Sequence, residues 1–169
     1  MFGHGQIEGF HEKYGMEFRT AKWNEQVNSG LVERHEREIF PLLRQRRIFS
    51  GVADFHLLDL DTPHGWVDED VIAYSNRYGD RRSLVVYHNK YAETSGWIRQ
   101  SAAFAVKAAD GSKHLEQRTL AEGLALPDDG SLWLRFRDSR AGLEFLRPVG
   151  EMRERGLHVS LQAYETKVF

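Results

Sequence analysis

The feature that most constrains the fold of this chain is a change in the spacing of its apolar residues at Gly51. Before Gly51, one segment repeats apolar residues every three to four positions, which is typical of an amphipathic helix. After Gly51, short runs alternate apolar and polar residues up to the last residue, which is typical of half-buried strands. The sequence therefore predicts an N-terminal helical segment within residues 1–50 and an all-β part over residues 51–169.

The helical segment is expected over about residues 30–48. Asn28 can cap its first turn, and Pro41 lies inside it. Because proline removes a backbone donor and crowds the preceding turn, we expect a kink or two abutting helices at that point. The apolar face consists of Leu31, His35, Ile39, Leu42 and Leu43. If this face does not dock on the sheet, we expect it to support self-association of the chain.

The strands are predicted from runs with a period of two. They cover residues 53–57, 71–76, 83–88, 97–106, 132–137 and 157–164. The segment 77–81 separates two of these runs, so they should form a hairpin. Since no helical period interrupts the runs, the pattern favours an antiparallel β-sandwich.

The opening stretch, MFGHGQIEGFHEKYGMEF, gathers histidines, glutamates and aromatic residues between glycines. His4, Glu8 and His11 could ligate a transition metal, but their spacing matches no zinc-binding helix and the glycines oppose a helix. Alternatively, the glycines allow sharp turns that the polar residues hold by hydrogen bonds. A third interpretation is a loop that faces a ligand, with Tyr14 and Trp23 available for stacking. We predict no metal and no cofactor.

Two tryptophans of the β part, Trp97 and Trp133, allow two interpretations. Packing in the core or between strands is the more common outcome, because aromatic side chains bury large areas. The other outcome is a platform on which sugar rings stack. The acid-rich stretch over residues 54–70 lacks the order of ligands of an EF-hand loop, so a solvated turn is the simpler interpretation.

Composition excludes several classes of function. A formal net charge of −2 provides no field that would attract nucleic acid. With no cysteine, the chain has no disulfide, thiolate nucleophile or cysteine-bound zinc. No apolar run approaches the ~18 residues of a membrane span, and no secretory signal is visible, which favours a cytoplasmic location. Walker loops and G-x-S-x-G or G-x-G-x-x-G motifs are also missing from the sequence.

The order of these segments resembles a known family. The stretch Gly5-Gln6-Ile7-Glu8-Gly9 precedes the helical segment, and DVIAYSNRYGDRRSLVVYHN then forms the predicted hairpin. This order is similar to the C-terminal end of an α-amylase-family enzyme (glycoside hydrolase family 13). In that family the last strand and helix of a (β/α)8 barrel lead into an antiparallel β-sandwich called domain C.

The resemblance implies that residues 1–50 are a remnant of the last barrel strand, loop and helix, and that residues 51–169 are domain C. A barrel takes ~250 residues, so the strands that carry the family's catalytic carboxylates cannot lie within 169 residues. We therefore expect a C-terminal fragment of an α-glucan-active glycoside hydrolase or transglycosidase of carbohydrate metabolism, inactive alone and without catalytic residues. The implied substrate contacts are His4, Glu8, His11, Tyr14 and Trp23. The alternative is a stand-alone β-sandwich module that binds carbohydrate or another partner.

Overall fold

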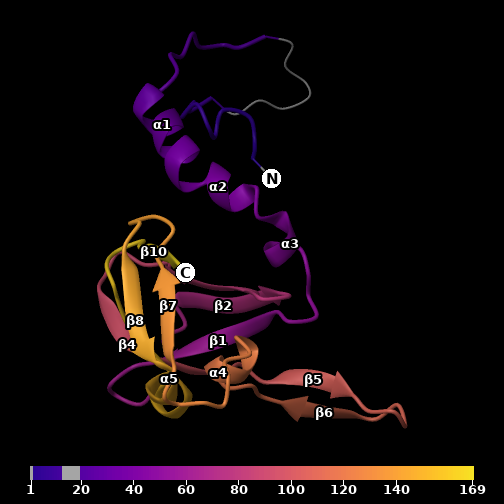
Figure 1. Ribbon diagram of the computed structural model, residues 1–169. Coiled ribbons are helices and arrows are strands. Elements are labelled where there is room, and N and C mark those ends of the chain that lie inside the picture. Colours follow the sequence, from indigo (N-terminus) through magenta and orange to yellow (C-terminus); the bar gives the residue numbers. More distant parts are fainter. Residues whose placement is uncertain (1, 13–19) are drawn as a thin grey trace. The chain divides into compact units, whose positions relative to one another are not determined.

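The computed structural model describes residues 2–12 and 20–169, and it divides the chain into two units, Met1–Arg46 and Arg47–Phe169 (Figure 1). The first unit contains loops and short helices. The second unit is built of antiparallel strands with a few short helices. The prediction of a mainly β chain with an N-terminal helical segment is therefore confirmed.

The helical segment is broken in the way that its proline predicts. Helix α1 covers Ser29–Glu38, and α2 covers Phe40–Leu43. The side chain of Asn28 caps α1 by accepting a hydrogen bond of 3.0 Å from the backbone N–H of Leu31. Pro41 lies in the first turn of α2, where its missing N–H has no helical partner to lose.

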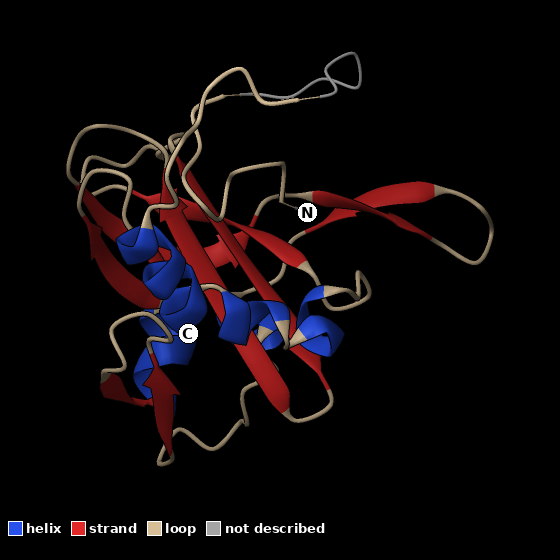
Figure 2. Ribbon diagram, turned by 90° about the horizontal axis from the view of Figure 1, so that it is seen from above, coloured by secondary structure: helices blue, strands red, loops and turns tan. Residues whose placement is uncertain are grey.

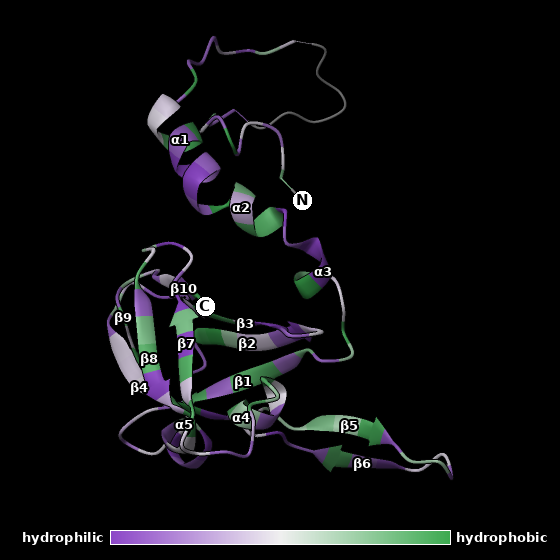
Figure 3. Ribbon diagram, in the orientation of Figure 1, coloured by the Kyte–Doolittle hydropathy of each residue, from purple (hydrophilic) through white to green (hydrophobic). Residues whose placement is uncertain are grey.

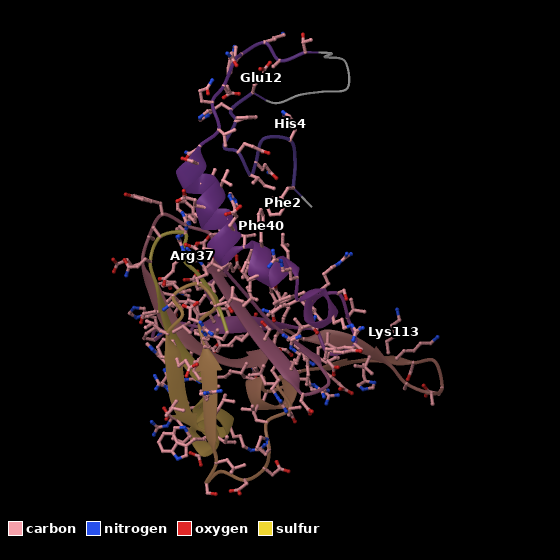
Figure 4. The ribbon with its side chains drawn as sticks, turned by 45° about the horizontal axis from the view of Figure 1, so that its top comes forward. Phe2, His4, Glu12, Arg37, Phe40 and Lys113 are labelled. Carbon is pink, nitrogen blue, oxygen red and sulfur yellow. The ribbon has the colours of Figure 1, made fainter. Side chains whose placement is uncertain are left out.

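An aromatic cluster covers part of the helical face in the first unit. The ring of Phe2 lies 6.1 Å from that of His35 and 6.4 Å from that of Phe40 (Figure 4). No residue of α1 or α2 is fully buried among the described residues, and Leu43 is 47% exposed. Self-association through this face stays a prediction.

Helix α3 (Arg46–Phe49) starts at the last residue of the first unit. The second unit contains a six-stranded antiparallel sheet in the order β10-β3-β2-β1-β4-β9. Its strands are β1 (His56–Asp61), β2 (Val71–Tyr78), β3 (Arg81–His88), β4 (Thr94–Ser101), β9 (Leu157–Leu161) and β10 (Thr166–Val168). The two edge strands, β9 and β10, are joined by residues 162–165 alone. A flat sheet would separate these edges by ~24 Å, whereas such a link reaches at most ~17 Å. The sheet must therefore curl.

A second layer covers one face of the sheet. It consists of the hairpin β7 (Trp133–Arg137) and β8 (Glu144–Pro148) with α4 (Leu120–Gly123) and α5 (Val149–Arg155). The core lies between the layers and includes Leu60, Ile98 and Leu161 of the sheet with Leu120 and Val149 of the helices. Along the strands, apolar and polar bands alternate as the core requires (Figure 3). This two-layer arrangement is sandwich-like, with helices completing the second layer.

A further hairpin, β5 (Phe104–Lys107) and β6 (Lys113–Glu116), projects from the body of the second unit (Figure 2). The predicted strand 97–106 is therefore two strands, because the chain leaves the sheet after Ser101. There the backbone N–H of Ala102 donates to Leu57 O at 2.9 Å, and that of Ser101 donates to Arg118 O at 2.7 Å.

The predicted strand at residues 53–57 is wrong in its bounds and in its buried face. The strand begins at His56, and its buried side chains are Leu58 and Leu60. Phe55 and Leu57 are 42% and 48% exposed. The ring of Phe55 instead packs on that of Tyr74 at 5.3 Å on the outer surface. This exposed aromatic contact explains why an apolar residue occupies a position that the sequence pattern assigned to the core.

The predicted elements do not include α4, α5, β6, β8 or β10. Helix α4 opens with a capping box, in which Thr119 and Glu122 satisfy each other's backbone N–H groups at 2.7 and 3.2 Å. That signal, T-x-x-E, was readable in the sequence. The expected hairpin of residues 71–88 is confirmed, with full pairing from Val71↔His88 to Tyr78↔Arg81.

His56 makes the stability of the second unit sensitive to pH. Burial lowers the pKa of this half-buried side chain, and the nearby charge of Arg118 lowers it further. Below pH ~6.5 the unfolded chain gains a proton that the folded chain resists, so the free energy of unfolding falls as the pH decreases through this range. We expect the urea midpoint of the wild-type protein to fall between pH 7.5 and pH 6.0.

The variant His56→Gln isolates this effect, because carboxyl groups titrate mainly below this range. We expect its midpoint to change less between the two pH values than that of the wild-type protein. Equal changes in both proteins would show that His56 does not contribute.

Candidate functional site

The predicted site at the N-terminus is a loop whose carboxylates bind its own backbone. Glu25 accepts hydrogen bonds from the N–H groups of His11 (2.7 Å) and Glu12 (2.9 Å). Those two bonds stabilise the charged form and lower the pKa of Glu25. Glu12 in turn accepts from the N–H groups of Lys22 and Trp23, both at 2.9 Å. Contacts of this kind are what the turn interpretation predicts.

The other described residues of the predicted site, His4, Glu8 and Trp23, lie at separate points of this loop. The ring of His4 lies 6.2 Å from that of Phe10 (Figure 4), and the carbonyl of Glu8 accepts from Asn28 N at 2.9 Å. Trp23 is 59% exposed. Tyr14 lies outside the described residues. In the parts of the chain that the structure describes, no group of three or more His, Asp or Glu side chains is placed to hold a metal ion.

Trp97 and Trp133, by contrast, are brought together in one pocket of about 440 Å³. Trp97 comes from β4, and Trp133 is the first residue of β7 in the covering layer. The other lining residues come from β8, α5 and β9; they are Leu146, Arg147, Pro148, Glu151, Gly156, Leu157 and His158. The pocket therefore lies where the edge strand β9 meets the covering hairpin.

The two tryptophans have different surroundings. Trp97 is half-buried, and its ring is held by an edge-to-face contact with His158 at 5.2 Å and by the guanidinium of Arg99 at 5.7 Å. Trp133 is 65% exposed, on the outer face of β7, opposite the inward-facing Leu134 and Phe136. Core packing is thus wrong for Trp133, because a core tryptophan would be covered.

Polar side chains surround the two rings. His158 is paired directly with Trp97 across the β4–β9 ladder, so both side chains lie on the same face of the sheet. Glu151 of α5 and Arg147 of β8 also line the pocket. Together they provide carboxylate acceptors, guanidinium donors and an imidazole beside two flat apolar rings. This combination suits a ligand that has apolar faces and hydroxyl edges.

Sequence reasoning singled out the two tryptophans but missed Arg147, Glu151 and His158. These residues join the pocket through strand register and through the packing of α5 beside β8. His158 was visible as a polar position of the last strand, but its partner Trp97 could be known only from the pairing of β4 with β9.

A different pocket, of about 350 Å³, opens beside β3 and is a weaker candidate. Its walls include Leu84, Leu126 and Met152, which belong to the core. The nearby guanidinium of Arg82 donates to the carbonyls of Asp80, Leu124 and Ala125. That cation already holds the backbone. The other polar lining residues, Asp80, Ser83, Arg135 and Arg137, are joined among the described residues by no aromatic rings except those of Phe136 and Phe169.

Comparison with models of protein families, with curated proteins and with solved structures finds no match for this chain. Among the helices of the described residues, none has the length and apolar character needed to cross a membrane.

Proposed function

We propose that this chain binds α-glucan or a related oligosaccharide through the pocket of Trp97 and Trp133. The observation that carries the proposal is the convergence of these two rings with Arg147, Glu151 and His158. The C–H faces of a pyranose ring pack well on an indole, and its hydroxyl groups need donors and acceptors around the rim. A pocket of about 440 Å³ is also within the usual range for small ligands.

The resemblance to the α-amylase family supports the choice of α-glucan. In this proposal the chain is the C-terminal part of an α-glucan-active glycoside hydrolase or transglycosidase. The second unit would be its domain C, and residues 1–50 would come from the end of its barrel. The antiparallel, sandwich-like fold of the second unit is compatible with this assignment. In the alternative proposal, the chain is a stand-alone binding module. It would bind its ligand in the same pocket but would not be part of a catalytic enzyme.

The pocket predicts a specific effect of Trp133→Ala. Calorimetric titration of the full chain with maltotriose should give measurable binding, and the variant should bind about tenfold more weakly, because an exposed stacking surface is lost. No reducing sugar should form from soluble starch, since the catalytic carboxylates of the family are missing from the sequence.

A matched control is Tyr91→Ala. Tyr91 is 85% exposed, contacts the ring of Tyr164 at 6.3 Å and lines neither wall of the tryptophan pocket. We expect it to bind as the wild-type protein does. If wild-type protein binds no maltooligosaccharide at millimolar concentrations, or if Trp133→Ala binds as tightly, the proposal is wrong.

A further inference from the structure

A third tryptophan lies close to the same part of the sheet and has no assigned role. Trp66 is 60% exposed, and its ring stacks on that of His64 at 4.8 Å with an interplanar angle of 15°. The loop that carries it is fixed at both ends. Thr62 donates to Trp66 O from its N–H and its hydroxyl, both at 2.9 Å, and Asp68 N–H donates to Leu60 O at 2.9 Å. The two stacked rings therefore form a preorganised flat surface.

This surface borders a polar pocket of about 470 Å³. Its lining includes His64, Trp66, Glu93, Ser95, Ser160 and Gln162. The wall is further held by Asp68, whose carboxylate accepts from the hydroxyl of Thr94 at 2.6 Å. Hydroxyl, amide and carboxylate groups thus face an exposed aromatic ring, which is the same chemistry as in the pocket of Trp97 and Trp133.

Strand register places the two pockets next to each other. Trp97 pairs with His158 in the first pocket, and Ser95 pairs with Ser160 in the second. Residues two apart in a strand lie on the same face, about 6.7 Å apart. The intervening pair, Gly96 and Val159, points to the other face. On this face of the sheet, the Trp97–His158 pair of the first pocket is therefore followed directly by the Ser95–Ser160 pair of the second.

We infer that the two pockets form one continuous binding surface for a linear oligosaccharide, with Trp66 as a second stacking platform beyond Trp97 and Trp133. One sugar ring packs between the first two tryptophans. The chain then passes over Ser95 and Ser160, and a later ring packs on Trp66. This inference rests on the proposed function, and it adds that the ligand is a chain several units long.

The indole N–H signals provide a direct test on the full chain. The protein has four tryptophans, so a two-dimensional ¹H–¹⁵N spectrum reports each one separately after assignment by single Trp→Phe variants. Maltotriose should shift the signals of Trp97 and Trp133. Maltoheptaose should also shift that of Trp66.

Affinity provides the second test. In calorimetry, the wild-type protein should bind maltoheptaose more tightly than maltotriose. Trp66→Ala should weaken maltoheptaose binding about tenfold and leave maltotriose binding unchanged. Ser160→Phe places a bulky ring at an exposed position of β9 between the two tryptophan sites, and phenylalanine is favoured in strands. This variant should bind maltoheptaose no more tightly than maltotriose.

The outcomes separate the two proposals. If maltotriose binds and Trp133→Ala weakens it, but Trp66→Ala leaves maltoheptaose affinity unchanged, the continuous surface is overturned and the first pocket stands. If Trp66→Ala weakens both ligands equally, Trp66 belongs to the same subsite and the inference is also overturned. If no ligand binds the wild-type protein, the proposed function itself is overturned.

Discussion

Replacing Gly156 by alanine is expected to reduce the free energy of unfolding of the second unit by about 3–5 kcal/mol. Gly156 follows α5 with φ 76° and ψ −153°, a backbone conformation that is nearly exclusive to glycine. A Cβ atom there would also overlap the carbonyl oxygen of Ile98 and lie 2.9 Å from the Cα of Arg99. Because both partners are backbone atoms of β4, neither can move without disturbing the sheet.

Three other glycines separate the effect of a positive φ from that of a steric overlap. Gly51 has neither positive φ nor any atom within 4 Å of an added Cβ, so Gly51→Ala should be neutral or slightly stabilising. Gly79 has φ +59° but open space, and its substitution should cost about 1 kcal/mol. Gly96 has no positive φ, but its Cβ would overlap the carbonyl oxygen of Asp61. Its cost should lie between those of Gly79 and Gly156.

Urea titration of these four variants, followed by far-ultraviolet circular dichroism, measures the series. The expected order of stability is Gly51→Ala, Gly79→Ala, Gly96→Ala and then Gly156→Ala. A Gly156→Ala protein as stable as the Gly79→Ala protein would contradict the close approach of α5's end to β4. That approach matters for function, since Gly156 lines the pocket of Trp97.

Much of the β architecture was predictable because its signals are local. The predicted strand 157–164 is confirmed over Leu157–Leu161, where Leu157, Val159 and Leu161 are buried, but it ends three residues earlier than predicted. Alternation over residues 132–137 likewise separated Leu134 and Phe136 from Trp133, Arg135 and Arg137, but it did not show that Trp133 lies on the exposed face. In both strands one face meets the core and the other meets solvent, so apolar and polar residues alternate regularly along the sequence.

Two of the missed elements show no periodic signal in the sequence, although α4 has the local T-x-x-E capping box. Strand β10 is only three residues long and exists because the curled sheet brings the C-terminus beside β3, where Phe169 and Leu84 exchange two backbone hydrogen bonds of 2.9 Å. Helix α4 has four residues, which is too short for a helical period to appear. Strand β10 depends on tertiary packing, whereas the capping box of α4 marks only the start of that helix.

The candidate site was predictable in its aromatic residues but not in its assembly. Trp133 reaches Trp97 only because the hairpin of β7 and β8 folds over the edge at β9, a long-range arrangement that spacing in the sequence cannot reveal. Trp66 was not considered at all, since it lies in a stretch interpreted as a solvated turn. Its exposure and its contact with His64 are properties of the folded loop.

The double variant Trp97→Ala/Trp133→Ala is expected to weaken maltotriose binding by about 100-fold or more relative to the wild-type protein. Each ring should contribute about 1.5–3 kcal/mol, and a factor of ten corresponds to about 1.4 kcal/mol. Trp97→Ala alone should have the larger effect on the pocket's shape, because its ring contacts His158 and Arg99. Trp133→Ala should remove mainly stacking surface, because that ring is 65% exposed.

A double-mutant cycle shows whether both rings act on one ligand. If they hold the same sugar ring, the effect of losing both should differ from the sum of the single effects by at least about 0.5 kcal/mol, since either loss loosens the ligand against the other ring. Unfolding of each variant in urea provides the control, because the binding argument applies only to variants that stay folded. Strict additivity in folded variants would show that the two tryptophans bind separate ligands or act at separate subsites.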